Sequence, residues 1–203
     1  MARSKQASGS PPKAAKAPET SGAPETEVGD PEAQARQICL RLLTIAPRTR
    51  AQLAQALHRG GVPDEAAETV LSRFADVGLI DDAAFARAWV ESRHHSRGLS
   101  RRSLSAELRR QGVDGEEIRE AVDILDPEQE VATARRLVEQ KMAGTRGQPS
   151  EVRVRRAAGA LARKGYPAGL VFRLIKEVLE QEGSTDAEAL DPDQYLDPDD
   201  PGE

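Results

Sequence analysis

The chain has 203 residues, of which 38% are hydrophobic, 31% charged and 3% aromatic, and its formal net charge is −5. This composition favours a helical core of Leu, Val, Ile and Ala. No apolar run reaches the ~20 residues of a membrane span, and no apolar segment follows the N-terminal charges as in a secretory signal. The single cysteine, Cys39, excludes an internal disulfide, so a cytoplasmic setting is expected.

Charge is segregated along the chain. Residues 1–31 are rich in Ala, Pro and Ser without apolar periodicity, and residues 183–203 form an acidic tail, so both are predicted to be disordered. The body between them carries a net positive charge. Alternating aspartates in the tail resemble a calcium loop, but Leu196 and Gly202 stand where glycine and glutamate are needed. The tail is interpreted as a solubilising segment, with autoinhibition of nucleic-acid binding as the alternative.

A three-helix pattern occurs three times in the body, at 32–80, 81–126 and 127–182. The first helices are predicted at about Glu32–Ile45, Ala83–Ser96 and Glu128–Met142. The inward face of the first includes Ile45, and that of the second includes Phe85 and Trp89, which are interpreted as core residues rather than as base-stacking ones.

The second and third helices of each repeat are predicted to form a tight helix–turn–helix pair. The repeats align on three glycines, each with a leucine four residues earlier, namely Leu57–Gly61, Leu108–Gly112 and Leu161–Gly165. Glycine suits the left-handed conformation at a helix C-terminus. The predicted fold is therefore all-α, with three tandem three-helix repeats forming an elongated array.

Two basic clusters occupy equivalent places in the second and third repeats. Residues 86–113 hold seven arginines against two acids, and residues 141–164 hold seven bases against one acid. An isolated run of this kind is usually a solvated helix face, but the repetition favours a partner-binding stripe. The candidate residues are Arg93, Arg97, Arg101, Arg102, Arg109, Arg110, Arg153, Arg155, Arg156, Arg163 and Lys164. Such arginines bind carboxylates or phosphates.

No motif of catalysis or cofactor binding is found. The sequence has no HExxH motif, phosphate-binding loop or recognisable nucleophile–base pair, so an enzyme is not expected. His94 and His95 have no carboxylate or cysteine at ligand spacing, which argues against a metal site. Exposure or contact with a phosphate is the interpretation of these two histidines.

The second repeat resembles the RecX family. The matching pattern is an acid followed by Phe85-Ala86, Trp89, Arg93, Arg97-Gly98, Arg102, Leu104, Glu107-Leu108, Gln111-Gly112-Val113 and Ile118. Gln111 departs from this pattern, because a lysine commonly precedes the glycine. The resemblance covers about Arg36 to Gln181 and is most specific in the second repeat.

The resemblance implies a non-enzymatic modulator of the bacterial recombinase RecA. RecX-like proteins bind RecA and its filament on single-stranded DNA, and they restrain filament growth, ATP hydrolysis, strand exchange and co-protease activity. The implied partners are RecA and the RecA–DNA filament, with single- or double-stranded DNA as a further partner of the arginine stripe. A monomer without cofactors is expected.

Two alternatives remain at this stage. A helix–turn–helix transcriptional regulator is suggested by the first repeat, but the presumed recognition helix, about Asp64–Val77, has Arg73 as its only base. A general scaffold is the second alternative, because helical repeats serve many partners.

Overall fold

The computed structural model describes residues 30–184 and 187, and this part of the chain contains helices without strands. The helices are α1 (Pro31–Ile45), α2 (Arg50–Arg59), α3 (Asp64–Asp76), α4 (Asp82–Arg97), α5 (Arg101–Arg110), α6 (Gly115–Asp123), α7 (Pro127–Ala143), α8 (Ser150–Ala162) and α9 (Ala168–Gln181). The predictions for the N-terminal extension and for most of the acidic tail lie outside the described residues.

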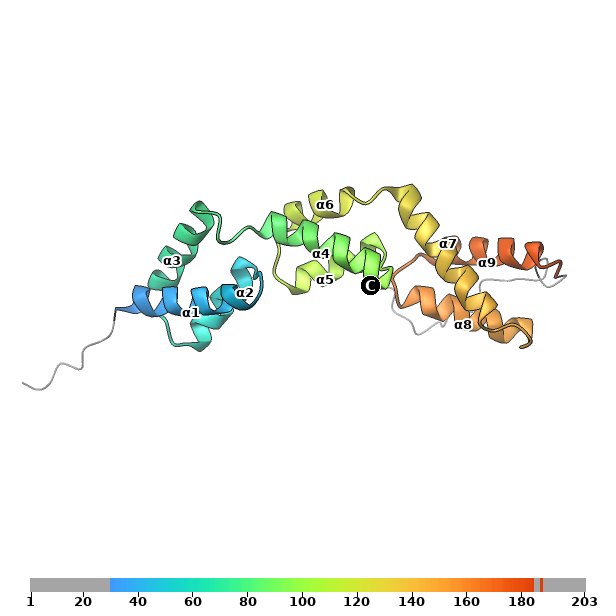
Figure 1. Cartoon of the computed structure of the whole chain (residues 1–203), viewed down its shortest axis with the longest axis horizontal. Helices are drawn as coiled ribbons and strands as arrows, with labels where there is room; N and C mark the ends of the chain where they lie inside the picture. The colour runs from blue at the N-terminus through green and yellow to red at the C-terminus, as the bar shows by residue number, and fades with distance from the viewer. Residues whose placement is uncertain (1–29, 185–186, 188–203) are drawn as a thin grey trace, which may run out of the picture.

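The helices form three units, α1–α3, α4–α6 and α7–α9, which follow one another along an elongated array (Figure 1). We call them repeats one, two and three. This arrangement confirms the all-α class and the tandem three-helix plan. In the view of Figure 1, the second helices α2, α5 and α8 lie along the lower edge of the array.

Short polar side chains begin most of the helices. Asp30, Thr49, Asp81, Ser100, Asp114 and Asp126 stand at N-cap positions, and each accepts a hydrogen bond from a backbone N–H of the first turn. These contacts satisfy amides that have no partner inside the helix. The aligned glycines have positive φ angles of 72°, 80° and 83°, as the predicted turns require.

Each repeat buries its own apolar cluster. Leu53 and Leu57 are fully buried in repeat one, Leu104 and Leu108 in repeat two, and Leu161 in repeat three. The array is thus built from neighbouring small cores rather than from one continuous core.

The predicted inward faces are mostly correct, with one error. Phe85 and Trp89 are half-buried against the core of repeat two, as core residues would be. Ile45 is 72% exposed and does not belong to the core of repeat one. It is the last residue of α1, where the helix ends and the chain turns away.

Polar contacts join repeat one to repeat two. The Thr49 hydroxyl, fully buried at the start of α2, donates to the Gln111 carbonyl at 2.7 Å. The backbone N–H of Arg50 donates to the Asp82 carboxylate at 2.9 Å. A carboxylate at this point is stabilised by the positive end of the α2 dipole. The N-terminus of α2 therefore docks against the α5–α6 turn and the start of α4.

The joint between repeats two and three uses equivalent positions. The backbone N–H of Ser100, at the start of α5, donates to the Lys164 carbonyl at 2.9 Å. The N–H of Arg101 donates to the Glu130 carboxylate at 2.8 Å. Both joints thus place the N-terminus of a second helix against the turn of the next repeat, which supports a similar relation between successive repeats.

Candidate partner-binding surface

Arg93 and Arg97 are held by a carboxylate within repeat two. Glu107, whose side chain is only 14% exposed, lies 3.0 Å from Arg97 Nη1 and 3.9 Å from Arg93 Nε. The Trp89 indole N–H donates to the same carboxylate at 3.0 Å, and the Arg93 guanidinium lies 4.4 Å from the Trp89 ring centroid. These contacts tie α4 to α5 and satisfy the charge of Glu107. Both arginines therefore have a structural task.

Arg101 and Arg153 also have partners inside their own repeats. Arg101 pairs with Asp123 and donates from Nε to the Val122 carbonyl at 3.0 Å, which connects α5 to α6. Arg153 lies 2.7 Å from Glu182 and its side chain is 11% exposed. An arginine so enclosed offers little charge to a partner.

Lys164 belongs to the joint between repeats two and three. Its ammonium group donates to the Arg97 carbonyl at the end of α4. Burial, followed by the positive charges of Arg97 and Lys141, lowers the pKa of Lys164 below its usual value. Its role in the joint explains why it cannot be counted with the freely exposed cations.

The remaining candidate arginines are exposed on the second helices of repeats two and three or just beyond their ends: Arg102, Arg109, Arg110, Arg155, Arg156 and Arg163. Arg102 has a contact of its own. The other five form no ion pair with any residue that the structure describes. Exposed guanidinium groups on α5 and α8, with the charge uncompensated, are suited to bind carboxylates or phosphates.

His94 is not an exposed residue, contrary to the prediction. Its Nδ1 lies 2.9 Å from the Leu99 carbonyl, and its Nε2 lies 3.1 Å from the Thr133 hydroxyl of α7. Because a carbonyl can only accept, Nδ1 carries the hydrogen. His94 therefore helps to join repeats two and three, and only His95 remains exposed.

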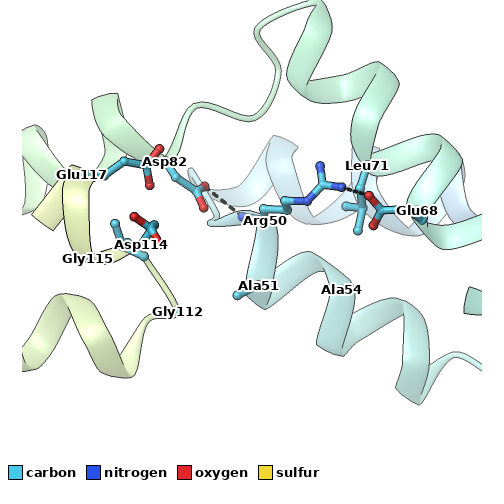
Figure 2. Close-up of a pocket in the computed structure, with 11 residues that line it drawn as sticks. Arg50, Ala51, Ala54, Glu68, Leu71, Asp82, Gly112, Asp114, Gly115 and Glu117 are labelled. Carbon is cyan, nitrogen blue, oxygen red and sulfur yellow. Dashed lines mark hydrogen bonds and ion pairs between the residues drawn. The ribbon is translucent and has the colours of Figure 1, made fainter.

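A cavity of about 630 Å³ lies at the joint between repeats one and two (Figure 2). Asp82, Asp114 and Glu117 line one side of it, whereas the Arg50 side chain extends away from them to pair with Glu68. Burial, and then the negative charge of Asp82, raises the pKa of Glu117. This acidic cluster is not predicted from the sequence, where its only signal is a set of acids near two helix starts.

The described residues hold neither a cluster of metal-ligating side chains nor a membrane-spanning helix. Residues 30–184 and 187 contain no group of three or more His, Cys, Asp or Glu side chains positioned to hold a metal ion. Among the same residues, no helix is both long enough and apolar enough to cross a membrane.

The fold and surface define an all-α tandem-repeat protein made of three three-helix domains. Models of the first, second and third three-helix domains of RecX match residues 35–74, 81–122 and 128–175, in that order. The chain belongs to the RecX family of regulatory proteins.

Its relatives span most of the chain. It is 61% identical over 166 residues to regulatory protein RecX of Thermobifida fusca, covering 82% of this chain and 88% of the relative. It is 60% identical over 154 residues to regulatory protein RecX of Streptomyces coelicolor, covering 76% and 82%. A crystal structure of regulatory protein RecX superposes with a TM-score of 0.64 at 26% identity, covering 73% of this chain and 72% of that one. RecX from Lactobacillus salivarius, at 17% identity and a TM-score of 0.66, shares the fold, with coverage of 73% and 96%.

Proposed function

We propose that this protein binds RecA and RecA filaments on single-stranded DNA and inhibits their activities. The inhibited activities are filament extension, ATP hydrolysis, strand exchange and co-protease action, so the protein modulates DNA repair and the SOS response. The observation that carries the proposal is the ordered match of three RecX domains to the three repeats. We place this action in the cytoplasm and expect the protein to act as a monomer.

The mechanism is occlusion rather than catalysis. An elongated array offers a long surface, along which adjacent subunits of a filament can be contacted at once. A bound array blocks the addition of RecA subunits, the entry of duplex DNA or the approach of a repressor. Binding of this kind needs no reacting group and no cofactor.

The contacts are assigned to the exposed arginines of α5 and α8 and of the turn after α8. Arg93, Arg97, Arg101 and Arg153 hold helices together through Glu107, Asp123 and Glu182, so their removal disturbs the fold before it disturbs a partner. Arg109, Arg155 and Arg156 form no ion pair with a described residue, which leaves their charge available for RecA carboxylates.

The test is ATP hydrolysis by RecA on single-stranded DNA, titrated with this protein well below one copy per RecA. We expect a substoichiometric loss of hydrolysis, because one array at a filament end or groove affects many subunits. Reversing Arg109, Arg155 and Arg156 to Glu is expected to raise the half-inhibitory concentration by at least tenfold, equivalent to about 1.4 kcal/mol of binding.

The matched control reverses Arg87, Arg119 and Arg136, which are exposed, belong to α4, α6 and α7, and form no ion pair with a described residue. This variant has the same net charge as the test variant and is expected to inhibit almost as well as the wild type. If both variants lose inhibition equally, the assignment of the RecA contacts to Arg109, Arg155 and Arg156 is wrong. If excess wild-type protein does not inhibit RecA from the same organism, the proposed function is wrong.

The transcriptional regulator remains the alternative, and its recognition helix would be α3. The first turn of α3 carries Asp64 and Glu65, and its basic residue Arg73 pairs with Glu32 at 2.7 Å. Such a helix repels phosphates. Sequence-specific DNA binding in the absence of RecA would favour this alternative.

A further inference from the structure

The chain that follows α9 is held against repeat three before its most acidic part begins. Ala187 is 3% exposed and belongs to the apolar cluster of repeat three. Shortly before it, the Glu182 carboxylate lies 2.7 Å from Arg153 of α8 and 3.8 Å from Arg146 of the α7–α8 turn. The end of α9 therefore lies beside the start of α8, at the outer end of the array (Figure 1). Residues after Ala187 start from this part of repeat three.

The next stretch of the chain, residues 188–203, carries charge of one sign only. Seven of these residues are Asp or Glu, and none is Lys or Arg. We call this stretch the acidic segment. At about 3.3 Å per residue, its length allows it to reach up to about 50 Å from Ala187. The 13 residues of α8 extend over about 20 Å, so every exposed base of α8 lies within reach of the acidic segment.

The outer side of α8 offers a positive surface of matching length. Arg156 and Arg163 are seven residues apart and therefore lie on the same side of the helix, two turns from each other. A Cβ on Gly159 would lie 3.4 Å from Arg163 Nη1, so this guanidinium group reaches back along α8 towards Arg156. Arg155 is exposed beside them. We call Arg155, Arg156 and Arg163 the α8 basic face.

The described part of repeat three leaves the charge of the α8 basic face uncompensated. None of its three arginines forms an ion pair with a described residue, whereas Glu177 pairs with Arg135 and Glu182 with Arg153. A solvated basic helix face and an acidic stretch are each ordinary features when they occur alone. Here they are parts of one chain and begin close together, which makes their contact intramolecular and raises the effective concentration of each for the other.

We propose that the acidic segment binds the α8 basic face and competes there with the anionic groups of a partner. The proposal rests on the proposed function and deepens it, because Arg155 and Arg156 are among the arginines assigned to RecA. A partner has to displace the acidic segment, so the full chain binds more weakly than a chain without it. Exposed ion pairs are individually weak, so a larger complementary surface can displace the segment.

The first experiment locates the acidic segment in the full chain, without RecA. A nitroxide on Gln194→Cys, in a Cys39→Ser background, broadens the backbone amide signals of residues that it approaches. We expect broadening along α8 and little in α3. The effect is expected at about 50 mM salt and to disappear at about 500 mM, because salt screens exposed charges. Changing the seven acids of the segment to their amides is expected to abolish it.

Charge-reversal variants test whether the α8 basic face is the binding surface. The test variant is Arg155→Glu, Arg156→Glu, Arg163→Glu. The control has the same change in charge on exposed residues of α4, α6 and α7, namely Arg87→Glu, Arg119→Glu, Arg136→Glu. Circular dichroism checks that both variants fold. We expect the test variant to lose the broadening along α8 and the control to keep it.

Three results would overturn the binding of the segment to α8. The first is broadening that is spread evenly over the body, and the second is broadening that the test variant retains. The third is equal broadening of isotope-labelled chains without nitroxide when they are mixed with nitroxide-labelled chains, because the segment would then bind a second copy.

The second experiment measures the competition. Removal of residues 188–203 is expected to lower the half-inhibitory concentration for ATP hydrolysis by RecA about two- to fivefold at low salt, since several weak ion pairs are lost. Removal in the test variant is expected to have no further effect, which separates loss of binding from loss of net charge. An unchanged half-inhibitory concentration, or an equal gain in the test variant, would overturn the competition.

Failure of this proposal is distinguishable from failure of the proposed function. If neither the full chain nor the shortened chain inhibits RecA, the proposed function is wrong and the competition with RecA is wrong with it. The amide broadening is measured without RecA and still decides whether the segment binds α8. If the full chain inhibits RecA but α8 shows no broadening, only the present proposal is wrong.

Discussion

At the scale of single residues, the surroundings of Glu117 disfavour its ionised carboxylate. Its carboxylate faces the cavity at the first joint together with Asp82 and Asp114 (Figure 2). Burial and the charge of Asp82 raise its pKa, and a hydrogen bond from a backbone N–H only partly opposes this effect. Since the pKa is higher in the folded chain than the usual 4.5, the ionised carboxylate destabilises the folded state at neutral pH.

We therefore expect Glu117→Gln to raise the melting temperature at pH 7. The gain is expected to shrink as the pH falls through the raised pKa and to vanish below about 4.5, where the carboxyl is protonated in both states. Calorimetry at several pH values measures it. Glu116→Gln is the control, since it removes the same charge from an exposed neighbour. A gain that does not depend on pH would contradict the explanation.

Residue type and helix position could be predicted for the arginines, but their availability could not. The candidate residues lie on or directly beside helices of repeats two and three, as the repeat pattern predicts. Arg93 and Arg97 are neutralised by Glu107, and Arg153 by Glu182, which comes from a different helix 29 residues away. Pairing of this kind depends on tertiary packing.

At the scale of helices and turns, two of the aligned glycines are required for two separate reasons, their positive φ angle and the close approach of a neighbouring repeat. Gly112 and Gly165 have φ angles of 80° and 83°. A Cβ on Gly112 would lie 2.3 Å from Ala51 Cβ, and one on Gly165 would lie 2.2 Å from Ser103 Oγ. Both neighbours belong to the preceding repeat, so the missing side chain lets consecutive repeats approach each other.

Alanine at either glycine is expected to strain the turn and also to force the joint apart. Gly61→Ala is the matched control, because Gly61 has a φ of 72° but no atom within 4 Å of the added Cβ. We expect the control to lose about 1 kcal/mol of stability from backbone strain alone. The two joint variants are expected to lose more and to change the small-angle scattering profile. Identical stability losses and unchanged scattering would show that the joints tolerate the methyl group.

Helices and turns were the most predictable level of this structure. The aligned glycines were predicted correctly as helix ends, because helix-end signals act over a few residues. The joints were not predicted. Their hydrogen bonds connect residues far apart in sequence, such as Thr49 with Gln111, and a threonine at a helix start gives no indication that it also contacts the next repeat.

At the scale of the whole molecule, the two joints are unequally filled. At the second joint, the buried Tyr166 hydroxyl donates to the Gly98 carbonyl at 3.1 Å, and burial raises the pKa of Tyr166 to about 12. His94 and Thr133 add a further contact there. The first joint instead borders the open cavity that is lined by acids. The second joint therefore has more contacts to break before its two repeats can move.

We expect repeat one to move against repeat two more than repeat two moves against repeat three. Spin labels at Arg41 and Arg119 span the first joint, and labels at Arg119 and Arg173 span the second, in a Cys39→Ser background. Electron–electron distance distributions are expected to be broader for the first pair. Equal widths would contradict the inference from packing.

No repeat precedes repeat one in the part of the chain that the structure describes, and the polar group of its turn is satisfied locally. The Gly60 carbonyl corresponds to those of Gln111 and Lys164, but it accepts from the Gln34 side chain of its own repeat at 3.0 Å. At the other end of the array, α8 begins after Pro149, which offers no hydroxyl to a further turn. Among residues 30–184 and 187, neither end of the array has the contact that joins successive repeats. The joint chemistry of the described residues therefore connects three repeats and stops there, which limits the length of surface that the array offers to a partner.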